Sequence, residues 1–213
     1  MRYGLASLAL LALALASPAQ DVGRPPRALE ARQGRLVASV DLAPAFPPEI
    51  RKPLSNGLTN VVVLYVALLP AYAQEPAALY GREVDVLYDV WDETYGVTVK
   101  DPGSPQGSRR TFRRFEELRS FLSDATAIDL GPLSGLGDAR WVIQTRVELN
   151  PISRELLQRT REFLANPAAS GRGAPSRSIL GAMASYLLRS ADPGAQVHVF
   201  RSAPFTAQEV RGR

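Results

Sequence analysis

Two segments of this chain alternate apolar and polar residues with a period of two, and this pattern constrains the fold more than any other feature. In the segment 81–92, one face carries Val84, Val86, Tyr88 and Val90. The opposite face carries Glu83, Asp85, Leu87, Asp89 and Trp91. The segment 139–149 alternates in the same way. Since successive side chains of a strand point to opposite faces, the segment 81–92 predicts a half-buried strand of an antiparallel sheet, and the segment 139–149 predicts a long strand.

Further strands and helices surround these two segments. Strands are expected at 35–42, 60–69, 95–100, 109–113 and 196–201. Helices are expected where apolar residues follow helical spacing, at 115–122, 152–164 and 179–188. These elements do not follow a strict β-α-β alternation. We therefore expect an α+β fold with an antiparallel sheet, for which a β-sandwich-like arrangement is one form, and with two to four packed helices.

The first nineteen residues have the pattern of a secretory signal peptide. Arg2 supplies a positive charge, residues 5–16 are apolar, and Ser17 and Ala19 are small residues at the −3 and −1 positions of a cleavage site. The apolar run is too short to span a membrane. The chain has no cysteine, so the lipid anchor of a bacterial lipoprotein is excluded. We expect an exported protein of the periplasm or cell envelope whose signal peptide is cleaved.

The composition divides the rest of the chain into four parts. Residues 20–34 are polar and rich in proline, as in a flexible leader, and residues 35–165 carry the sheet-rich core domain. Residues 166–178 have the composition of a linker. The last part, 179–213, contains a helix and a strand that we expect to dock on the core. The helix at 179–188 is apolar nearly all round, so it is either part of the core or a contact for a partner or a membrane.

Several short motifs connect the chain with a family of exported bacterial proteins. They are the apolar strand after Gly57 and the segments 87–95, 114–118 and 146–151. In order and content, these motifs resemble the uncharacterised proteins that share domain of unknown function 4390, over roughly residues 35–165. The resemblance implies an envelope location and a sheet-rich domain. It implies no known activity and no catalytic residues.

The most concentrated charge lies in the segment 109–119. Five arginines there surround Phe112 and the start of the expected helix: Arg109, Arg110, Arg113, Arg114 and Arg119. Export argues against nucleic acid as the partner of such a cluster. We expect these arginines to contact an acidic partner protein of the envelope or anionic lipid headgroups. The structural alternative is a solvated strand edge whose arginines pair with Glu83, Asp85 or Glu148.

No group of residues in the sequence indicates catalysis, a metal or a cofactor. His198 is the only histidine, and no serine lies in a nucleophile-elbow motif that could use it. Asp85 and Asp89 would lie about 13 Å apart on one strand face, which is too far to chelate one ion. We therefore assign no catalytic, metal-binding or cofactor-binding residue.

Three functions are compatible with these observations. The favoured one is a non-enzymatic interaction domain of the cell envelope that works through a protein partner. The first alternative is a peripheral membrane protein that contacts lipid through the arginines of 109–119 and the helix of 179–188. The second alternative is a hydrolase whose site is assembled from several strands, with Asp89 and His198 as its best residues.

Overall fold

The computed structural model describes residues 28–73, 75–151 and 196–212. The strands of this part form two sheets in which neighbouring strands are antiparallel, and they outweigh a few short helices. The expected sheet-dominated α+β class with antiparallel strands is therefore confirmed. The signal peptide of 1–19, the linker of 166–178 and the helices expected at 152–164 and 179–188 lie outside the described residues.

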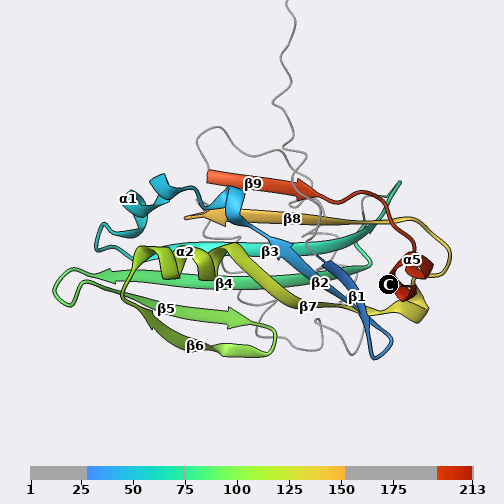
Figure 1. The fold of residues 1–213 in the computed structure, drawn as a ribbon, viewed down its shortest axis with the longest axis horizontal. Helices are drawn as coiled ribbons and strands as arrows, with labels where there is room; N and C mark the ends of the chain where they lie inside the picture. Colours follow the sequence, from blue (N-terminus) through green and yellow to red (C-terminus); the bar gives the residue numbers. More distant parts are fainter. Residues whose placement is uncertain (1–27, 74, 152–195, 213) are drawn as a thin grey trace, which may run out of the picture.

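The larger sheet has six strands in the order β6-β5-β4-β3-β8-β9 (Figure 1). They are β3 (Asn60–Pro70), β4 (Ala78–Asp89), β5 (Thr94–Asp101), β6 (Ser104–Phe112), β8 (Trp141–Leu149) and β9 (Gln196–Arg201). Three hairpins join β3 to β6 in sequence order, and β8 and β9 continue the sheet on the other side of β3. The strands expected at 60–69, 95–100, 139–149 and 196–201 are confirmed, with small shifts at their ends.

Two strand boundaries differ from the expected ones, and both differences shape the surface. β4 ends at Asp89, so Val90 and Trp91 lie in the turn to β5 and not on the two faces of a strand. β6 begins at Ser104, five residues before the expected start. The carboxylate of Asp101 accepts two backbone N–H groups of the intervening turn, which shortens the expected loop.

The smaller sheet has three strands in the order β1-β2-β7. They are β1 (Ala28–Arg32), β2 (Arg35–Asp41) and β7 (Asp124–Pro132). β2 matches the strand expected at 35–42. The expected flexible leader over 20–34 is wrong for residues 28–32, because these pair with β2 as β1. β7 has no counterpart among the expected elements. Its alternation is interrupted by a bulge, where Ala127 has a φ of 56°.

The described helices are short. They are η1 (Ala43–Ala45), η2 (Pro48–Ile50), α1 (Arg51–Leu54), α2 (Phe115–Ser123), η3 (Leu133–Gly135) and α5 (Ala207–Arg211). The helix expected at 115–122 is confirmed as α2, and its apolar residues Phe115, Leu118 and Leu122 are buried. Glu116 and Glu117 occupy its first turn, where carboxylates interact favourably with the helix dipole.

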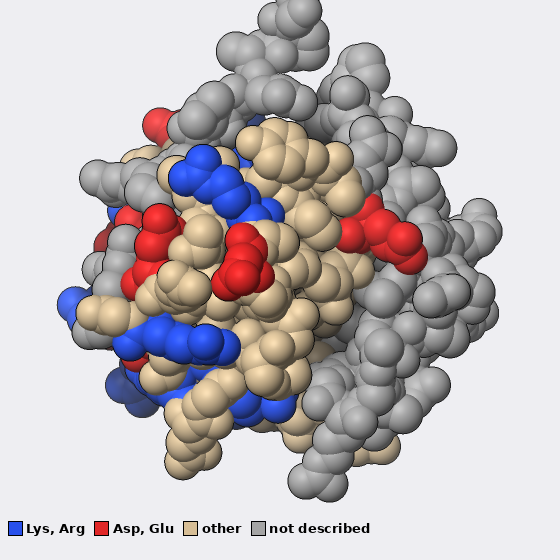
Figure 2. All heavy atoms as spheres, turned by 90° about the vertical axis from the view of Figure 1, so that its right-hand side faces the viewer, with Lys and Arg blue, Asp and Glu red and all other residues tan. Residues whose placement is uncertain are grey.

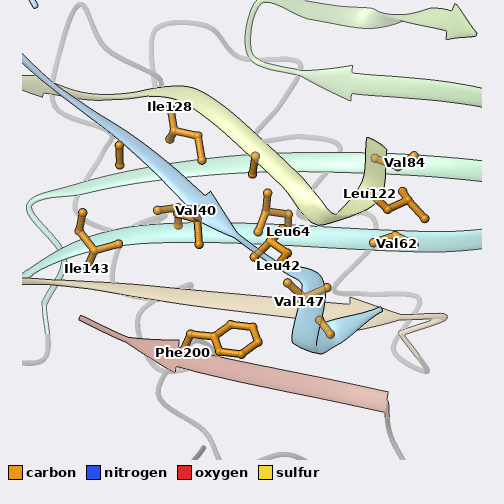
Figure 3. Close-up of a cluster of buried hydrophobic side chains, with 14 of the residues drawn as sticks. Val40, Leu42, Val62, Leu64, Val84, Leu122, Ile128, Ile143, Val147 and Phe200 are labelled. Carbon is orange, nitrogen blue, oxygen red and sulfur yellow. The ribbon is translucent and has the colours of Figure 1, made fainter. Parts of the chain in front are cut away.

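The hydrophobic core lies between the two sheets. β2, β7 and α2 cover one face of the larger sheet, and β5 and β6 extend beyond this cover (Figure 1). Figure 3 shows side chains of β2 and β7, such as Val40 and Ile128, directed at Leu64 of β3 and Ile143 of β8. On β2, Leu36, Ala38 and Val40 alternate along the strand and contribute to this core. The part of β5 and β6 that the smaller sheet leaves uncovered borders the groove described below.

Candidate interaction surfaces

The first two arginines of the segment 109–119 lie on opposite faces of β6. Arg109 is opposite Thr98 of β5, and Arg110 is opposite Val97. Because Val97 belongs to the hydrophobic core, Arg110 lies on the face that the smaller sheet partly covers, and Arg109 lies on the other face. Two neighbours in the sequence therefore face different environments.

The other three arginines are also separated. Arg113 and Arg114 are exposed at the junction between β6 and α2, where a guanidinium nitrogen of Arg114 lies 2.7 Å from the Glu117 carboxylate. This ion pair lowers the pKa of Glu117. Arg119 is half-buried on α2. The expected cluster of five is thus divided, and Arg110 and Arg114 are the two members that line a common groove.

This groove lies between the uncovered part of β5 and β6 and a wall formed by α2 and the start of β7. It is open and has a volume of about 990 Å³. Its lining includes three arginines, four carboxylates and a small apolar floor. These residues, which we call the arginine groove, are Arg82, Val99, Asp101, Ser108, Arg110, Arg114, Glu116, Glu117, Ser120, Phe121, Asp124 and Thr126.

Most charges of the groove have partners within the domain. Asp101 accepts the N–H groups of its turn, Glu117 pairs with Arg114, and Asp124 is also engaged in an interaction. Arg110 differs from these, because its guanidinium lies 5.0 Å from the centre of the Phe121 ring and makes no ion pair within the described part of the chain. Stacking on an aromatic ring leaves the N–H groups at the guanidinium edge available to an acceptor.

Arg82 is the one arginine of the groove that the sequence patterns did not point to. It lies on the core-facing side of β4, in line with Val84 and Val86 and opposite Leu64 of β3. Its Nε donates a hydrogen bond of 3.0 Å to the hydroxyl of Tyr80, whose pKa is raised by burial. The signal was present in the sequence, since an arginine on an otherwise apolar strand face marks either a pairing or a site.

The second surface lies at the end of the larger sheet where β4 turns into β5. Among the described residues, five large hydrophobic side chains are exposed, and four of them lie here. We call this surface the hairpin end: Leu58 (66% exposed), Leu87 (46%), Val90 (56%) and Trp91 (90%). The loop of Leu58 reaches the turn, because a Cβ added to Gly57 would lie 3.5 Å from a methyl group of Val90.

The turn that presents Trp91 is fixed by Asp89. The carboxylate of Asp89 accepts the backbone N–H groups of Asp92 at 3.1 Å and of Trp91 at 2.8 Å. These bonds lower the pKa of Asp89, so the carboxylate is ionised at neutral pH. Glu93 completes the turn with a φ of 50°. The tryptophan is thus held outward on a structured turn that also carries three acidic residues.

The opposite end of the molecule is different in character. Figure 2 looks at this end and shows positive and negative side chains interspersed with uncharged ones. Its ion pairs include Arg35 with Asp129 at 2.6 Å. Of the residues that the structure describes, one large hydrophobic side chain is exposed away from the hairpin end, namely Tyr72, which is 94% exposed in the turn between β3 and β4. Tyr72 therefore matches Trp91 in exposure but lacks its apolar neighbours.

The face of the larger sheet that points away from the core carries a band of charges, of which Glu83, Arg146 and Glu148 are buried and Asp85 and Lys100 are half-buried. We call these residues the charged band: Glu83, Asp85, Lys100, Arg146 and Glu148. Lys100 Nζ lies 2.7 Å from Glu83 and 2.6 Å from Asp85, and Arg146 pairs with Glu148. The alternative that the arginines of 109–119 pair with these carboxylates is wrong. Lys100 of β5 lies opposite Glu83 of β4 and pairs with Glu83 and Asp85 in their place.

The pKa of Lys100 shows that its hydrogen bonds to carboxylates outweigh the cost of its partial burial. Partial burial lowers the pKa of its ammonium group, whereas the hydrogen bonds to Asp85 and Glu83 raise it, and the net result is a raised pKa. The side chain of Glu83 is fully buried, so it depends on its partners to compensate for its lost hydration. The charged band is therefore a structural feature of the sheet.

The residues considered for catalysis do not come together. Asp89 lies in the turn of the hairpin end, whereas His198 lies on β9 opposite Val147, with its ring 6.4 Å from that of Phe200. Two further strands, β3 and β8, separate β4 from β9. In the described part of the chain, no group of three or more histidine, cysteine or acidic residues is arranged to hold a metal ion.

The comparisons with known proteins add no information to this geometry. No protein-family model, no curated protein and no solved structure matches the chain. Within residues 28–73, 75–151 and 196–212, no helix has the length and apolar character needed to cross a membrane. The arginine groove, the hairpin end and the charged band are therefore the features of the described residues that bear on function.

Proposed function

We propose that the chain is a non-enzymatic interaction domain, exported to the cell envelope, that docks on a protein partner through the hairpin end. The observation that carries the proposal is the exposure of Trp91 together with Leu58, Leu87 and Val90. The envelope address rests on the signal-peptide pattern of residues 1–19. The resemblance to the family with domain of unknown function 4390 supports the same address.

The hairpin end has the properties of a contact surface. Exposed single hydrophobic residues are common on proteins, but a group of them at one end of a sheet marks a binding site more often than chance placement. Tryptophan is also the residue type most enriched among the side chains that dominate binding energy at interfaces. Transfer of one large apolar side chain from water into an interface contributes about 1.5–3 kcal/mol.

The charges beside Trp91 favour a protein partner over an anionic membrane. Asp89, Asp92 and Glu93 lie in the same turn, and carboxylates are repelled by the negative surface of anionic lipids. A protein pocket with a basic rim can accept the indole ring and these carboxylates together. We therefore place lipid contact second, as an outcome that the test below can reveal.

We also propose a more detailed description of the fold that presents the hairpin end. Two packed antiparallel sheets favour a β-sandwich-like description of the domain, and we infer two to four packed helices for the whole chain. A sheet with a filled core provides a rigid platform for the turn between β4 and β5. Rigid presentation of an aromatic side chain lowers the entropy that binding would otherwise cost.

Substitutions at the two most exposed aromatic side chains test the proposal. The full chain, Trp91→Ser and Tyr72→Ser are expressed in the producing cells and purified from detergent-solubilised envelopes. We expect one protein to co-purify with the full chain and with Tyr72→Ser but to be lost with Trp91→Ser. Equal recovery with all three forms would contradict the proposal.

A flotation assay decides between a protein and a lipid partner. The full chain and Trp91→Ser are mixed with anionic or neutral liposomes and centrifuged on a gradient. We expect neither form to float. Flotation of the full chain with anionic liposomes, lost in Trp91→Ser, would replace the protein partner by a membrane surface.

A further inference from the structure

We propose that the arginine groove is a second binding site, which takes an extended acidic segment of a partner protein. The proposal does not depend on the hairpin end, because the two surfaces share no residue. It rests on the charges of the groove that the domain leaves uncompensated, on their spacing and on the strands that border them.

Two of the three arginines of the groove have no carboxylate partner among the described residues. Of the four carboxylates, Glu117 pairs with Arg114, Asp101 accepts backbone N–H groups, Asp124 is engaged in an interaction, and Glu116 is exposed on the groove wall. Arg82 donates only its Nε, to the neutral hydroxyl of Tyr80, and Arg110 contacts only the face of Phe121 within the described residues. The remaining guanidinium N–H groups of these two arginines can bind carboxylates, for which the planar guanidinium is well suited.

The floor of the groove suits the backbone and short side chains of a peptide. Val99 and Phe121 provide apolar surface, and Ser108, Ser120 and Thr126 provide hydroxyl groups along it. Such a mixture offers hydrogen bonds along an extended chain as well as contacts for its carbons. A small inorganic anion would use only the charges and would leave most of a groove of about 990 Å³ empty.

The spacing of the two arginines also favours an extended segment. Arg82 lies on β4 and Arg110 on β6, with β5 between them, and Arg110 is level with Val86 of β4 through Val97. By the ordinary strand spacing and rise per residue, the two Cα atoms are roughly 16 Å apart. An extended peptide spans this distance in about five residues. Because residues an even number of positions apart share one side of an extended peptide, two acidic residues four positions apart come closest to matching the two arginines, and an alternating sequence provides them.

Two edge strands border the groove, in addition to α2. β6 is the last strand of the larger sheet and β7 is the last strand of the smaller sheet, among the strands that the structure describes. Strand edges are the elements beside which extended peptides commonly bind in proteins. The location of the groove therefore agrees with the extended form of the ligand that its charges predict.

Peptide binding to the full chain tests this site. The probe is a fluorescein-labelled peptide of alternating glutamate and serine, followed by fluorescence anisotropy, with an alternating lysine and serine peptide as control. We expect binding of the acidic peptide only, and weaker binding as NaCl is added. Arg82→Gln and Arg110→Gln should each weaken binding by about three- to tenfold.

Two further variants make the test specific for the groove. Arg109→Gln removes the same charge from the other face of β6, and we expect its affinity to stay within about twofold of the full chain. Glu116→Gln removes the exposed carboxylate of the groove wall, and we expect it to strengthen binding about two- to fivefold. Because Arg110 is exposed, Arg110→Gln remains informative even if Arg82→Gln fails to fold.

The outcomes separate this site from its alternatives. Equal losses in Arg109→Gln and Arg110→Gln, or no binding of the acidic peptide, would overturn the proposal. Competition by inorganic phosphate at concentrations similar to those of the peptide would replace the acidic segment by a small anion. Trp91→Ser should bind the peptide normally, so the failure of one surface does not imply the failure of the other.

Discussion

The charged band and the hairpin end are opposite departures from the usual distribution of residues. In the charged band, acidic and basic side chains are buried on the sheet face that points away from the core. At the hairpin end, a tryptophan and three aliphatic side chains are exposed. Buried charges and exposed apolar groups are the two arrangements that need a physical explanation.

The difference between the two regions lies in where their partners are. The charges of the band have partners within the same sheet: Lys100 of β5 pairs with Glu83 of the neighbouring β4, and Arg146 pairs with Glu148 on its own strand, β8. The apolar side chains of the hairpin end are not covered. The band should therefore contribute to stability and the hairpin end to binding. Each prediction below separates these two contributions.

The largest expected effect is on stability and comes from Arg146. Arg146→Met leaves the buried carboxylate of Glu148 without its ion pair, and removal of one partner of a buried pair costs about 3–5 kcal/mol. We expect a loss of that size in the free energy of unfolding, measured with urea. The double variant Arg146→Met/Glu148→Leu should lose less than Arg146→Met alone, because it removes both charges of this pair. If the double variant were less stable than Arg146→Met, the loss of stability in Arg146→Met would not come from the unpaired carboxylate of Glu148.

Lys100 should give the next largest effect, together with a dependence on pH. Lys100→Met removes two hydrogen bonds to carboxylates and should cost about 1.5–3 kcal/mol at neutral pH. The pKa of Lys100 is raised above its ordinary value of 10.5, so its contribution is complete below pH 10.5 and is lost as the pH rises through the folded-state pKa.

Chemical unfolding across the alkaline range tests this second prediction. We expect the full chain and Lys52→Met, which changes the exposed lysine, to lose stability more steeply above pH 10.5 than Lys100→Met. The raised pKa of Tyr80 makes a contribution of the same sign in all three forms. If stability fell equally with pH in all three forms, the ion pairs of Lys100 would not contribute to the stability of the fold.

The smallest expected effect on stability is at the hairpin end. Trp91→Ser removes a side chain that is 90% exposed, so we expect the free energy of unfolding to change by less than about 0.5 kcal/mol. Partner binding should be lost in the same variant. A loss of stability comparable to that of Arg146→Met would instead mean that Trp91 is needed for the fold.

Local sequence patterns predicted most of the fold. Alternation identified β4 and β8, and helical spacing identified α2, whose apolar side is buried. β8 is nevertheless buried along both faces, since every residue from Trp141 to Leu149 is buried. β7 was missed because its bulge at Ala127 breaks the alternation. β1 was missed because its residues are only half-buried or exposed, and its pairing with β2 is what makes it a strand.

The candidate surfaces were harder to predict, because they depend on strand ends and on register. Arg109 and Arg110 look equivalent in the sequence, and only the face of β6 separates them. Trp91 belongs to an alternating pattern, and the hydrogen bonds of Asp89 place it in a turn. The charged band requires the pairing of β4 with β5, which brings Lys100 to Glu83 and Asp85.

Site-specific photo-crosslinking tests the central claim most directly. A benzophenone amino acid replaces either Trp91 or Tyr72, two aromatic side chains that are 90% and 94% exposed at opposite ends of the molecule. On illumination of intact producing cells, the account predicts a discrete protein adduct from position 91 that is missing from position 72. The same adducts from both positions, or an adduct from position 72 alone, would contradict the assignment of the hairpin end as the docking surface.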